Sequence, residues 1–569
     1  MEIRKIFLVT IIVFLFGIVE AGHIIVVESN MYRMDKTLKL ILINQDLEYL
    51  NKLYSNEKKS ILLDDEEYVL KEPIITIQIG HVYYVVNSAG EEYSLYFTEL
   101  PIIEIKTSNE IDNITKKLAY FTMVEKNQNM IHSAIGVKYR GGSTFQMPKK
   151  PFRIEFWEDD TGDITKDVEL LKMRSDDDWN LQAIYNEPLR FRSKTNNDLW
   201  RKIYSPYYQS MEPDAINGIK MKYAELFFNG EYRGLYCVSE RVDRKQLKLK
   251  KYNGDIRGEL YKGIAKGNSI YEKLPPYENG NSIWDGFEYI YPDEIAPYWN
   301  NLYDFVDFVI NSENSVFYSQ YNAYFDIDNL VDYYIFLNLL RATDNTGKNV
   351  FVAKYKIDEP YFYVPWDLDG TFGIRWTGKK EYITNDLLSN GLYDRLWNDC
   401  YEGGFKEKLK NRWNGLRKET LTYDNLMEMF LDNYNYLLDN GVYERESIVW
   451  TEYKLDYDDI IYMSDWLSNR LKFLDRIFNA ACDESVIRSY DNSNFNIYPN
   501  PVRDELVLEA DYESDFTIDI YNYSGQLLLS SMINSQNNKI RVSDLSNGIY
   551  FIHIRNEGIS VVKKIIVQR

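Results

Sequence analysis

The first hundred residues alternate short apolar runs with polar turns. The runs include HIIVVES (23–29), TLKLILIN (37–44), ITIQIG (75–80) and HVYYVVN (81–87). Runs of this length, rich in Val, Ile and Tyr and bounded by turn residues, are typical of β-strands. Residues 22–96 are therefore predicted to form a small all-β domain, and the apolar run at 100–105 is predicted to open the next unit.

The middle of the chain changes from strands to helices. Strands are predicted at 135–139, 152–157, 223–228 and 234–239, and Asn229-Gly230 suits a type I′ hairpin turn between the last two. A first helix is predicted at 188–204, where apolar residues recur among charges. Further helices are predicted at 300–311, 329–343, 387–398, 425–440 and 456–480. The body of the chain, residues 97–482, is thus expected to be mixed α+β, with a β-rich half before a helical half.

The last part of the chain is a separate β module. Residues 483–494 are polar and are predicted to be a linker, and residues 495–569 alternate apolar and polar positions between turn signals. About seven short strands in this length favour a small, immunoglobulin-like β-sandwich. The predicted fold class is therefore multidomain α+β.

The N-terminus has the pattern of a secretory signal. Arg4 and Lys5 form a positive segment, residues 6–19 are apolar, and Ala21 ends a small-residue cleavage site. A membrane anchor is the alternative, but the apolar run is shorter than the roughly twenty residues of a spanning helix. Residues 1–21 are therefore predicted to be a signal peptide, and the mature chain is predicted to have no transmembrane span.

The composition excludes several classes of function. The formal net charge of −21 argues against nucleic-acid binding, which needs a basic face, and against polybasic attachment to a membrane. Four histidines are scattered, and the three cysteines, Cys237, Cys400 and Cys482, lack metal-ligand spacing. One long-range disulfide fits this cysteine count, with its pairing left open.

One stretch carries most of the candidate chemistry. Asp344 and Asn349 have D-x-x-x-x-N spacing, and Asp367 and Asp369 follow in WDLDGTFG after a strand-like run. Phosphoryl transfer uses this order of groups: a carboxylate near the attacking hydroxyl, then an amide and a carboxylate that hold metal. Because Leu368 separates the later carboxylates, both point to one side of an extended strand and suit joint chelation. Turn-capping Asp and Asn residues are the alternative interpretation.

Six short motifs occur in order between residues 139 and 373. They are YRGGS (139–143), PKKPFRI (148–154), DDDWNL (176–181), FNGEYRG (228–234), SERV (239–242) and PWDLDGTFG (365–373). Together they resemble the spore coat protein H (CotH) kinase family, over about residues 97–480. The resemblance implies an atypical, two-lobed protein kinase fold that binds ATP with Mg²⁺ or Mn²⁺ and phosphorylates a hydroxyl of an unknown protein.

The resemblance also assigns roles by position. Asp344 is expected to orient or deprotonate the acceptor hydroxyl, since a carboxylate accepts the hydrogen bond of that hydroxyl. Asn349, Asp367 and Asp369 are expected to hold the metal ion. Two nearby carboxylates without a cation raise each other's pKa, which favours the metal interpretation.

Several cations are candidates for the phosphate groups. Lys150 is the first choice for a catalytic, phosphate-contacting lysine, and Lys149 and Arg140 are its competitors. Lys262 is a further candidate for ATP contact. Solvated surface charges are the alternative for all of them.

Two further positions are candidates around the nucleotide. Glu240 follows the predicted strand 234–239 at the place of a kinase hinge and is expected to meet the adenine amine; an exposed salt bridge with a neighbouring arginine is the alternative. Glu187 or Arg190 is the candidate partner of the phosphate-contacting lysine, and the sequence does not choose between them.

The tail carries a second resemblance. NIYPNP (496–501), YNYSGQ (521–526), LSNGIY (545–550) and the terminal VVKKIIV (561–567) are similar to the C-terminal sorting domain of the type IX secretion system. The similarity implies a diderm bacterium, passage through the periplasm, type IX secretion machinery as partner, and a secreted or outer-membrane surface location. A generic adhesion module is the alternative.

Three functions compete at this stage. The first is an exported protein kinase that uses ATP in the periplasm or outside the cell. The second is a pseudokinase or surface structural protein, and the third is an adhesin that binds glycans without nucleotide. The presence of Asp344, Asn349, Asp367 and Asp369 favours the first.

Overall fold

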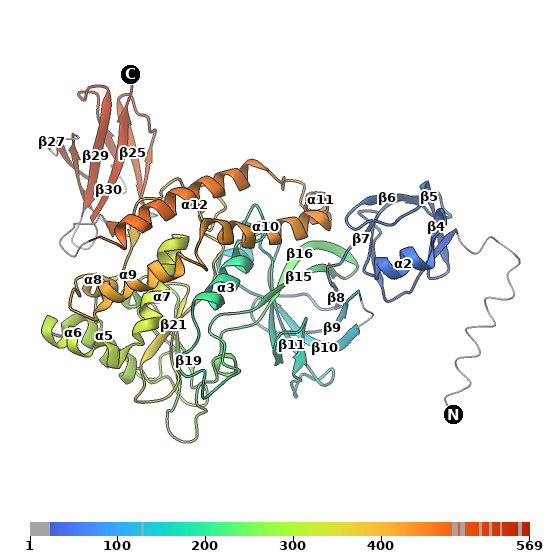
Figure 1. Ribbon diagram of the computed structural model, residues 1–569, viewed down its shortest axis with the longest axis horizontal. Coiled ribbons are helices and arrows are strands. Elements are labelled where there is room, and N and C mark those ends of the chain that lie inside the picture. The colour runs from blue at the N-terminus through green and yellow to red at the C-terminus, as the bar shows by residue number, and fades with distance from the viewer. Residues whose placement is uncertain are drawn as a thin grey trace, which may run out of the picture. The chain divides into compact units, whose positions relative to one another are not determined.

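The computed structural model describes residues 23–126, 130–480, 488–489, 495–510, 515–522, 526–534, 538–555 and 560–569 (Figure 1). The chain divides into two compact units. The first comprises the chain up to Arg201, Gly218–Val242 and Asp424–Ile461; the second comprises Lys202–Asn217, Asp243–Tyr423 and Tyr462–Arg569. The predicted signal peptide, 1–21, lies outside the described residues, as does the predicted linker, 483–494, apart from residues 488–489. Within the described part of the chain, no helix is both long and apolar enough for a membrane span.

The first unit begins with a seven-stranded sheet. Its strands are β1 (Ile24–Val27), β2 (Tyr32–Asp35), β3 (Leu40–Ile43), β4 (Lys58–Leu63), β5 (Glu66–Ile74), β6 (Val82–Val86) and β7 (Glu92–Phe97), in the order β1-β4-β5-β6-β7-β3-β2. Inward-facing side chains such as Ile41, Ile61 and Leu95 form its core. A short helix, α2 (Leu47–Leu53), interrupts the predicted all-β pattern, and the Asp46 carboxylate caps it.

The strand predicted at 75–80 is wrong. β5 ends at Ile74, and the next residues are irregular. The Asn51 side chain of α2 forms hydrogen bonds with both main-chain groups of Ile77: it donates to the carbonyl at 2.9 Å and accepts from the amide at 2.8 Å. These groups are therefore unavailable to a sheet ladder, although the alternation of the sequence favours a strand.

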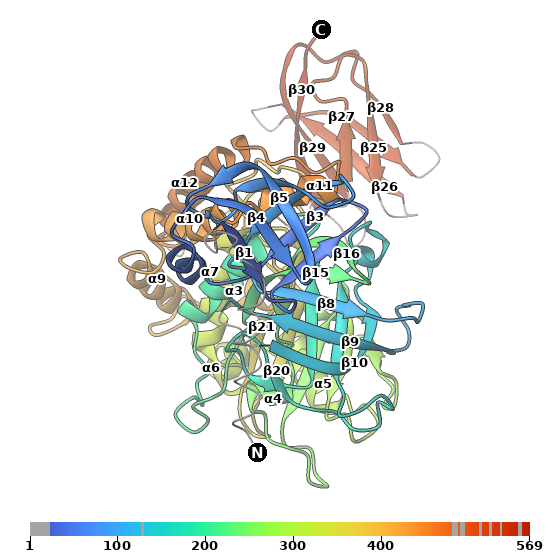
Figure 2. The same ribbon diagram turned by 90° about the vertical axis from the view of Figure 1, so that its right-hand side faces the viewer.

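A closed barrel follows the first sheet. Its strands are β8 (Ile102–Lys106), β9 (Lys117–Val124), β10 (Met130–Tyr139), β11 (Phe152–Phe156), β14 (Asp178–Gln182), β15 (Met221–Phe228) and β16 (Glu231–Ser239), in the order β10-β11-β14-β16-β15-β8-β9. Figure 2 shows β8, β9 and β10 side by side. The hairpin predicted at 229–230 is confirmed: Asn229 and Gly230 both have positive φ, as a type I′ turn requires.

The barrel surrounds a dense apolar core. Phe121 and Phe156 pack edge to face with their ring centroids 5.2 Å apart, and Trp179 is fully buried beside them. The connections of the barrel contain two short paired strands, β12 (Val168–Glu169) and β13 (Ser175–Asp176), and the 3₁₀ turn η1 (Ser143–Gln146).

Three helices complete the first unit. They are α3 (Arg192–Ile203) and α10 (Tyr423–Asp439), each of which crosses the division between the units at one end, and α11 (Val442–Val449). The helix predicted at 188–204 begins later than expected, at Arg192. Arg190 has a left-handed backbone (φ 62°), which a helix does not accept, and its guanidinium binds the Ile184 and Glu187 carbonyls.

The second unit is built on a five-stranded antiparallel sheet covered by helices. The sheet order is β18 (Ile283–Trp284), β19 (Phe287–Tyr291), β17 (Glu259–Gly263), β20 (Val350–Lys354) and β21 (Tyr361–Pro365). The helices are α4 (Arg244–Leu247), α5 (Asn300–Asn311), α6 (Asn314–Tyr324), α7 (Ile327–Leu340), α8 (Gly391–Leu396), α9 (Phe405–Leu416) and most of α12 (Asp458–Ile477), with 3₁₀ turns η2 (Asn268–Ile270) and η3 (Thr343–Asn345). α7 packs on β21 and is buried along nearly its whole length.

The helix predicted at 387–398 is only partly correct. Residues Leu387–Leu388 form β22, which pairs in parallel with β23 (Arg488–Ser489), and α8 begins at Gly391. Asn390 caps this helix by accepting a hydrogen bond from the Tyr393 amide at 3.1 Å. The cap fixes the start of α8 and leaves the preceding residues extended.

The tail forms two sheets around one core. They are β24 (Phe495–Tyr498), β25 (Glu505–Ala510) and β28 (Lys539–Arg541) in one sheet, and β27 (Leu527–Ile533), β26 (Phe516–Tyr521), β29 (Gly548–Arg555) and β30 (Ser560–Val567) in the other. Val502, Leu506, Ile518 and Ile552 contribute to the shared core. The small β module is confirmed as a two-sheet arrangement; its immunoglobulin-like topology and the two-lobed kinase arrangement of the body stay predictions.

Candidate active site

The loop after α7 carries the first predicted catalytic residue. α7 ends at Leu340, the left-handed residue Arg341 caps it, and the chain then makes the turn η3. Asp344 lies in this turn with 28% of its side chain exposed, and its Oδ2 accepts from the Lys348 ammonium at 3.0 Å. The carboxylate is therefore reachable from solvent and has a cation beside it, as a group that meets an acceptor hydroxyl requires.

Asn345 fixes this loop from within. Its buried amide donates to the Asn349 carbonyl at 2.9 Å and to the Trp366 carbonyl at 2.7 Å. The Tyr333 hydroxyl donates to the Asn345 carbonyl at 2.8 Å. One side chain thus joins the loop of Asp344 and Asn349 to the end of β21, immediately before Asp367. Sequence reasoning missed Asn345, for which its place next to Asp344 was the only signal.

The predicted metal ligands lie where β20 and β21 meet this loop. Val350 pairs with Pro365, and the Trp366 amide donates to the Asn349 carbonyl at 3.0 Å. This register pairs the Asn349 carbonyl with Trp366, the residue that precedes Asp367 in the chain. The amide and the two carboxylates are hard oxygen donors of the kind that Mg²⁺ and Mn²⁺ prefer, so the donor set fits such an ion.

The expected geometry of the Asp pair needs a correction. β21 ends at Pro365, and Asp367 has a left-handed backbone with φ 57°, so the pair does not lie on an extended strand. Leu368 is buried, whereas Asp367 is exposed and Asp369 half-buried in the following turn. Asn349, Asp367 and Phe372 have positive φ, a backbone conformation that Asn and Asp adopt more readily than most other residues.

An acidic trio lies elsewhere, in the first unit. Among the described residues, Asp167, Asp176 and Asp177 bring carboxylate oxygens within 4.8 Å of one another. Arg174 already forms an ion pair with Asp176. None of the three is a predicted ligand.

Two lysines of the second unit lie on β17 and in the loop after it. Lys262 lies on β17 opposite Phe351, with its ammonium 5.8 Å from that ring's centroid. Lys266 follows in the next loop, where burial lowers its pKa to about 8 despite the attraction of Asp344. This loop packs tightly on the Asp344 loop, because a methyl group at Gly263 would lie 1.9 Å from the Gly347 carbonyl oxygen. Lys266 was missed, since nothing in its sequence context distinguishes it.

The remaining candidates lie in the first unit, and Lys149 is fully buried there. Its ammonium donates to Glu446 at 2.7 Å and to the Leu235 carbonyl at 2.6 Å, and its side chain is fully buried. Arg190 shares the same glutamate at 3.0 Å. Burial lowers the pKa of Lys149 to about 8, against the attraction of Glu446. The partner of this lysine is thus Glu446 of α11, and Glu187 instead pairs with Arg192.

Lys150 and Arg140 stabilise the glycine-containing loop between β10 and β11. Lys150 donates to the carbonyls of Phe145 at 2.7 Å and Met147 at 3.2 Å, and Arg140 donates to Gln182. Gly141 has φ 94°, and a methyl group there would overlap the Thr144 hydroxyl. Lys150 therefore bonds to carbonyls within this loop, and Arg140 ties the start of the loop to β14.

Glu240 does not lie in an exposed salt bridge. Its side chain is buried and accepts hydrogen bonds from the Lys220 amide at 2.9 Å and the Arg174 amide at 3.3 Å. In this position it fixes two loops next to the barrel.

The cysteines divide into two kinds. Cys237 is a free thiol on β16, and burial raises its pKa. Cys400 takes part in a disulfide. Cys482 lies outside the described residues.

Asn345 gives the first test of this site. Replacing Asn345 by Ala leaves the Trp366 carbonyl without its buried donor, and we expect a loss of about 1–3 kcal/mol in the free energy of unfolding. Asn217 is a control in the same unit: its buried amide donates to the Tyr363 carbonyl at 3.0 Å, and Asn329 also donates to that carbonyl at 3.1 Å. Urea unfolding should therefore show a smaller stability loss in Asn217→Ala, and phosphoryl transfer should fall only in Asn345→Ala. Equal transfer in both variants would contradict the assigned role of Asn345.

Comparison with known families agrees with the motifs. The family model described as CotH kinase protein matches residues 137–474, which is more than half of the chain. The model described as secretion system C-terminal sorting domain matches residues 496–568. No curated protein matches the chain. The first match covers both Asp344 and the Asp367–Asp369 loop, and the second covers nearly all of the tail module.

Proposed function

Because this chain belongs to the CotH kinase protein family, we propose that it is an exported, metal-dependent protein kinase. It transfers the γ-phosphate of ATP to a hydroxyl of a protein substrate. The observation that carries the proposal is the connection made by Asn345, which ties the loop of Asp344 and Asn349 to the chain at Asp367. This arrangement joins an acceptor-side carboxylate to a set of oxygen donors for a metal ion.

Each side chain of the proposed site has its own role in the transfer. Asp344 accepts the hydrogen bond of the acceptor hydroxyl and takes its proton as the new phosphorus–oxygen bond forms. Asn349, Asp367 and Asp369 hold the metal ion, which when bound neutralises charge on the phosphates. Lys266 and Lys348 place positive charge around Asp344. The exposure of Asp344 and Asp367 supports this assignment, since both must reach a bound substrate.

The tail determines where the enzyme acts. A secretion-system sorting domain directs its chain to the secretion machinery. We propose that the protein enters the periplasm through its N-terminal signal, crosses the outer membrane through the type IX system and acts at the cell surface or in the medium. Its ATP must then come from the periplasm or from outside the cell.

Binding of Mn²⁺-ATP tests the proposed metal site. Replacing Asp367 by Asn removes a negative ligand, and we expect the affinity for Mn²⁺-ATP to fall by about tenfold or more, or about 1.4 kcal/mol. Isothermal titration calorimetry on the purified protein measures this directly. Asp358→Asn, in an exposed turn of the same unit, is the control and should bind as the wild type does. Equal affinity in Asp367→Asn and the wild type would refute the metal role.

The pH dependence tests Lys266. Burial lowers its pKa to about 8, while Asp344 raises it and Lys348 lowers it. The charge is present below this pKa, so transfer that depends on it should decline as pH rises through about 8. Lys266→Arg, which stays protonated, should move this alkaline decline to higher pH. Initial rates measured from about pH 6.5 to about pH 9.5, a range that brackets the Lys266 pKa of about 8, show the effect. An unchanged profile in the variant would exclude a role for the Lys266 charge in transfer.

A further inference from the structure

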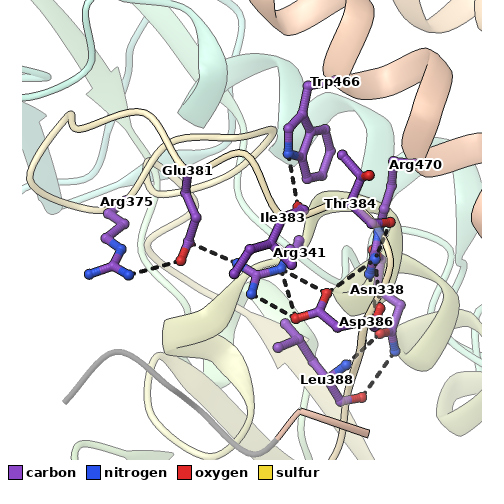
Figure 3. Close-up of polar contacts among 10 residues, drawn as sticks. All are labelled: Asn338, Arg341, Arg375, Glu381, Ile383, Thr384, Asp386, Leu388, Trp466 and Arg470. Carbon is purple, nitrogen blue, oxygen red and sulfur yellow. Dashed lines mark hydrogen bonds and ion pairs between the residues drawn. The ribbon is translucent and has the colours of Figure 1, made fainter. Parts of the chain in front are cut away.

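The segment that follows the Asp pair returns to the end of α7. Residues 373–388 contain little regular structure, yet their main-chain groups are bonded to side chains of α7 and α12 (Figure 3). The Tyr462 hydroxyl donates to the Gly373 carbonyl at 2.7 Å, and the Trp466 indole donates to the Ile383 carbonyl at 3.0 Å. The segment is therefore held in one conformation by side chains and not by a sheet.

Arg341 connects this segment to the loop of Asp344. Its guanidinium bonds Asp386 through two parallel contacts, Nε to Oδ1 at 2.8 Å and Nη2 to Oδ2 at 2.7 Å. Its third nitrogen bonds Glu381 at 2.7 Å, and Glu381 also accepts from Arg375 at 2.9 Å. Arg341 caps the end of α7, and Asp344 follows three positions later.

A second arginine completes the cluster. Arg470 of α12 is fully buried; it donates to the Asn338 carbonyl at 2.7 Å and to the Asp386 carbonyl at 2.6 Å. Figure 3 shows Asp386 between the guanidinium groups of Arg341 and Arg470. The Asn338 side chain accepts a hydrogen bond from the Leu388 amide at 2.8 Å and donates one to the Leu388 carbonyl at 3.2 Å.

The end of α7 is also bonded to the loop that contains Asp367 and Asp369. The Phe372 amide donates to the Leu340 carbonyl at 2.9 Å, one residue before Arg341. Arg341 thus lies at the junction of the Asp344 loop, the Asp367–Asp369 loop and the 373–388 segment. Buried ion pairs contribute little net stability compared with apolar packing of the same volume, but they fix geometry.

We propose that Arg341 and Asp386 are positioning residues, which set the place of the Asp344 carboxylate relative to the Asp367–Asp369 loop. The inference rests on the proposed function. The left-handed backbone of Arg341 turns the chain out of α7, and the paired contacts to Asp386 fix the side chain of this turning residue on the 373–388 segment. Arg341 itself has its guanidinium on Asp386 and Glu381, so it acts on the reaction through Asp344.

The test compares two arginines that make the same paired contact with an aspartate, one buried and the other partly exposed. Arg412 bonds Asp332 of α7 through Nε at 2.7 Å and Nη2 at 3.0 Å, in the same unit but away from the loop of Asp344. Arg341→Lys and Arg412→Lys each keep the charge and lose the paired contact. We expect Arg341→Lys to lower kcat at least about tenfold, with KM for Mn²⁺-ATP within about twofold. We expect Arg412→Lys to leave both constants near their wild-type values.

Hydrogen exchange gives a readout that does not need activity. Amides of residues 342–349 should exchange faster in Arg341→Lys than in the wild type, and not in Arg412→Lys. Unchanged exchange there, or an equal fall in kcat in both variants, would overturn the proposal. If the wild type transfers no phosphate, the proposed function fails, while the exchange result still decides the positioning role. If Arg341→Lys does not fold, Glu381→Ala removes one contact of Arg341 and should show the same changes more weakly.

Discussion

Replacing Asp344 by Asn is expected to lower kcat by about 10²–10⁴-fold, the usual contribution of a positioned acid or base. Asn keeps the shape of the side chain but does not take the proton of the acceptor hydroxyl. Asp344 is partly exposed, and its ion pair with Lys348 is a surface pair. The free energy of unfolding should therefore change by no more than about 1 kcal/mol.

Lys348 separates the two roles of Asp344. Lys348→Ala removes the ion pair and leaves the carboxylate, so we expect a loss of only a few fold in kcat, on the order of 1 kcal/mol. Initial rates with saturating Mn²⁺-ATP, together with urea unfolding of each variant, measure both effects. Asp344→Asn with activity near the wild-type level would exclude Asp344 as the acceptor-side carboxylate.

The largest loss of stability is expected at Glu446. This carboxylate is fully buried and bonds Lys149 at 2.7 Å and Arg190 at 3.0 Å. Glu446→Gln leaves two buried cations without their counter-charge, and removal of one partner of a buried ion pair costs about 3–5 kcal/mol. Burial raises the pKa of Glu446, but the charges of Lys149 and Arg190 outweigh it and hold that pKa below its usual value.

The pH dependence of this loss has a definite sign. The pKa of Lys149 is about 8 in the folded protein, below that of an unfolded lysine. The unfolded state therefore binds more protons than the folded state above pH 8, and the Lys149 contribution to stability rises with pH there. Without Glu446 the folded-state pKa of Lys149 falls further, so the variant releases this proton at a lower pH than the wild type. The deficit of Glu446→Gln should therefore shrink as pH rises toward about 8 and stay constant above it.

Urea unfolding at several pH values measures the Glu446 effect. Glu444→Gln is the control on the same helix, since Glu444 is exposed and accepts one bond from the Tyr96 hydroxyl at 3.0 Å. We expect it to cost about 1 kcal/mol or less. A comparable, small cost in Glu446→Gln would mean that the Lys149 cluster does not stabilise the first unit.

The sequence predicts those features that depend on neighbouring residues. The Asn229-Gly230 turn follows from two residues that accept positive φ, and α5 agrees with the predicted range 300–311. The failures have local causes that hydrophobic pattern does not contain. The Asn51 side chain occupies the main-chain groups of Ile77, and the left-handed backbone of Arg190 delays the start of α3.

In the candidate site, too, local sequence order was predictable and long-range contacts were not. The order of Asp344, Asn349, Asp367 and Asp369 was readable because all four lie within one stretch of chain. The partners that hold buried charges are distant in sequence: Glu446 is 297 residues from Lys149. Arg470 likewise lies 132 residues from Asn338. Spacing carries no signal for such pairs, because only the packing of α11 and α12 determines which groups meet.

The most direct test of the kinase assignment is transfer of labelled γ-phosphate. The purified protein would be incubated with γ-labelled ATP and Mn²⁺ or Mg²⁺, alone and with a casein-type acceptor, beside Asp344→Asn and Asp367→Asn. We expect metal-dependent labelling of Ser, Thr or Tyr hydroxyls by the wild type, with labelling lost in both variants. Labelling of equal strength in all three proteins, or none in the wild type despite tight binding of Mn²⁺-ATP, would contradict the kinase assignment.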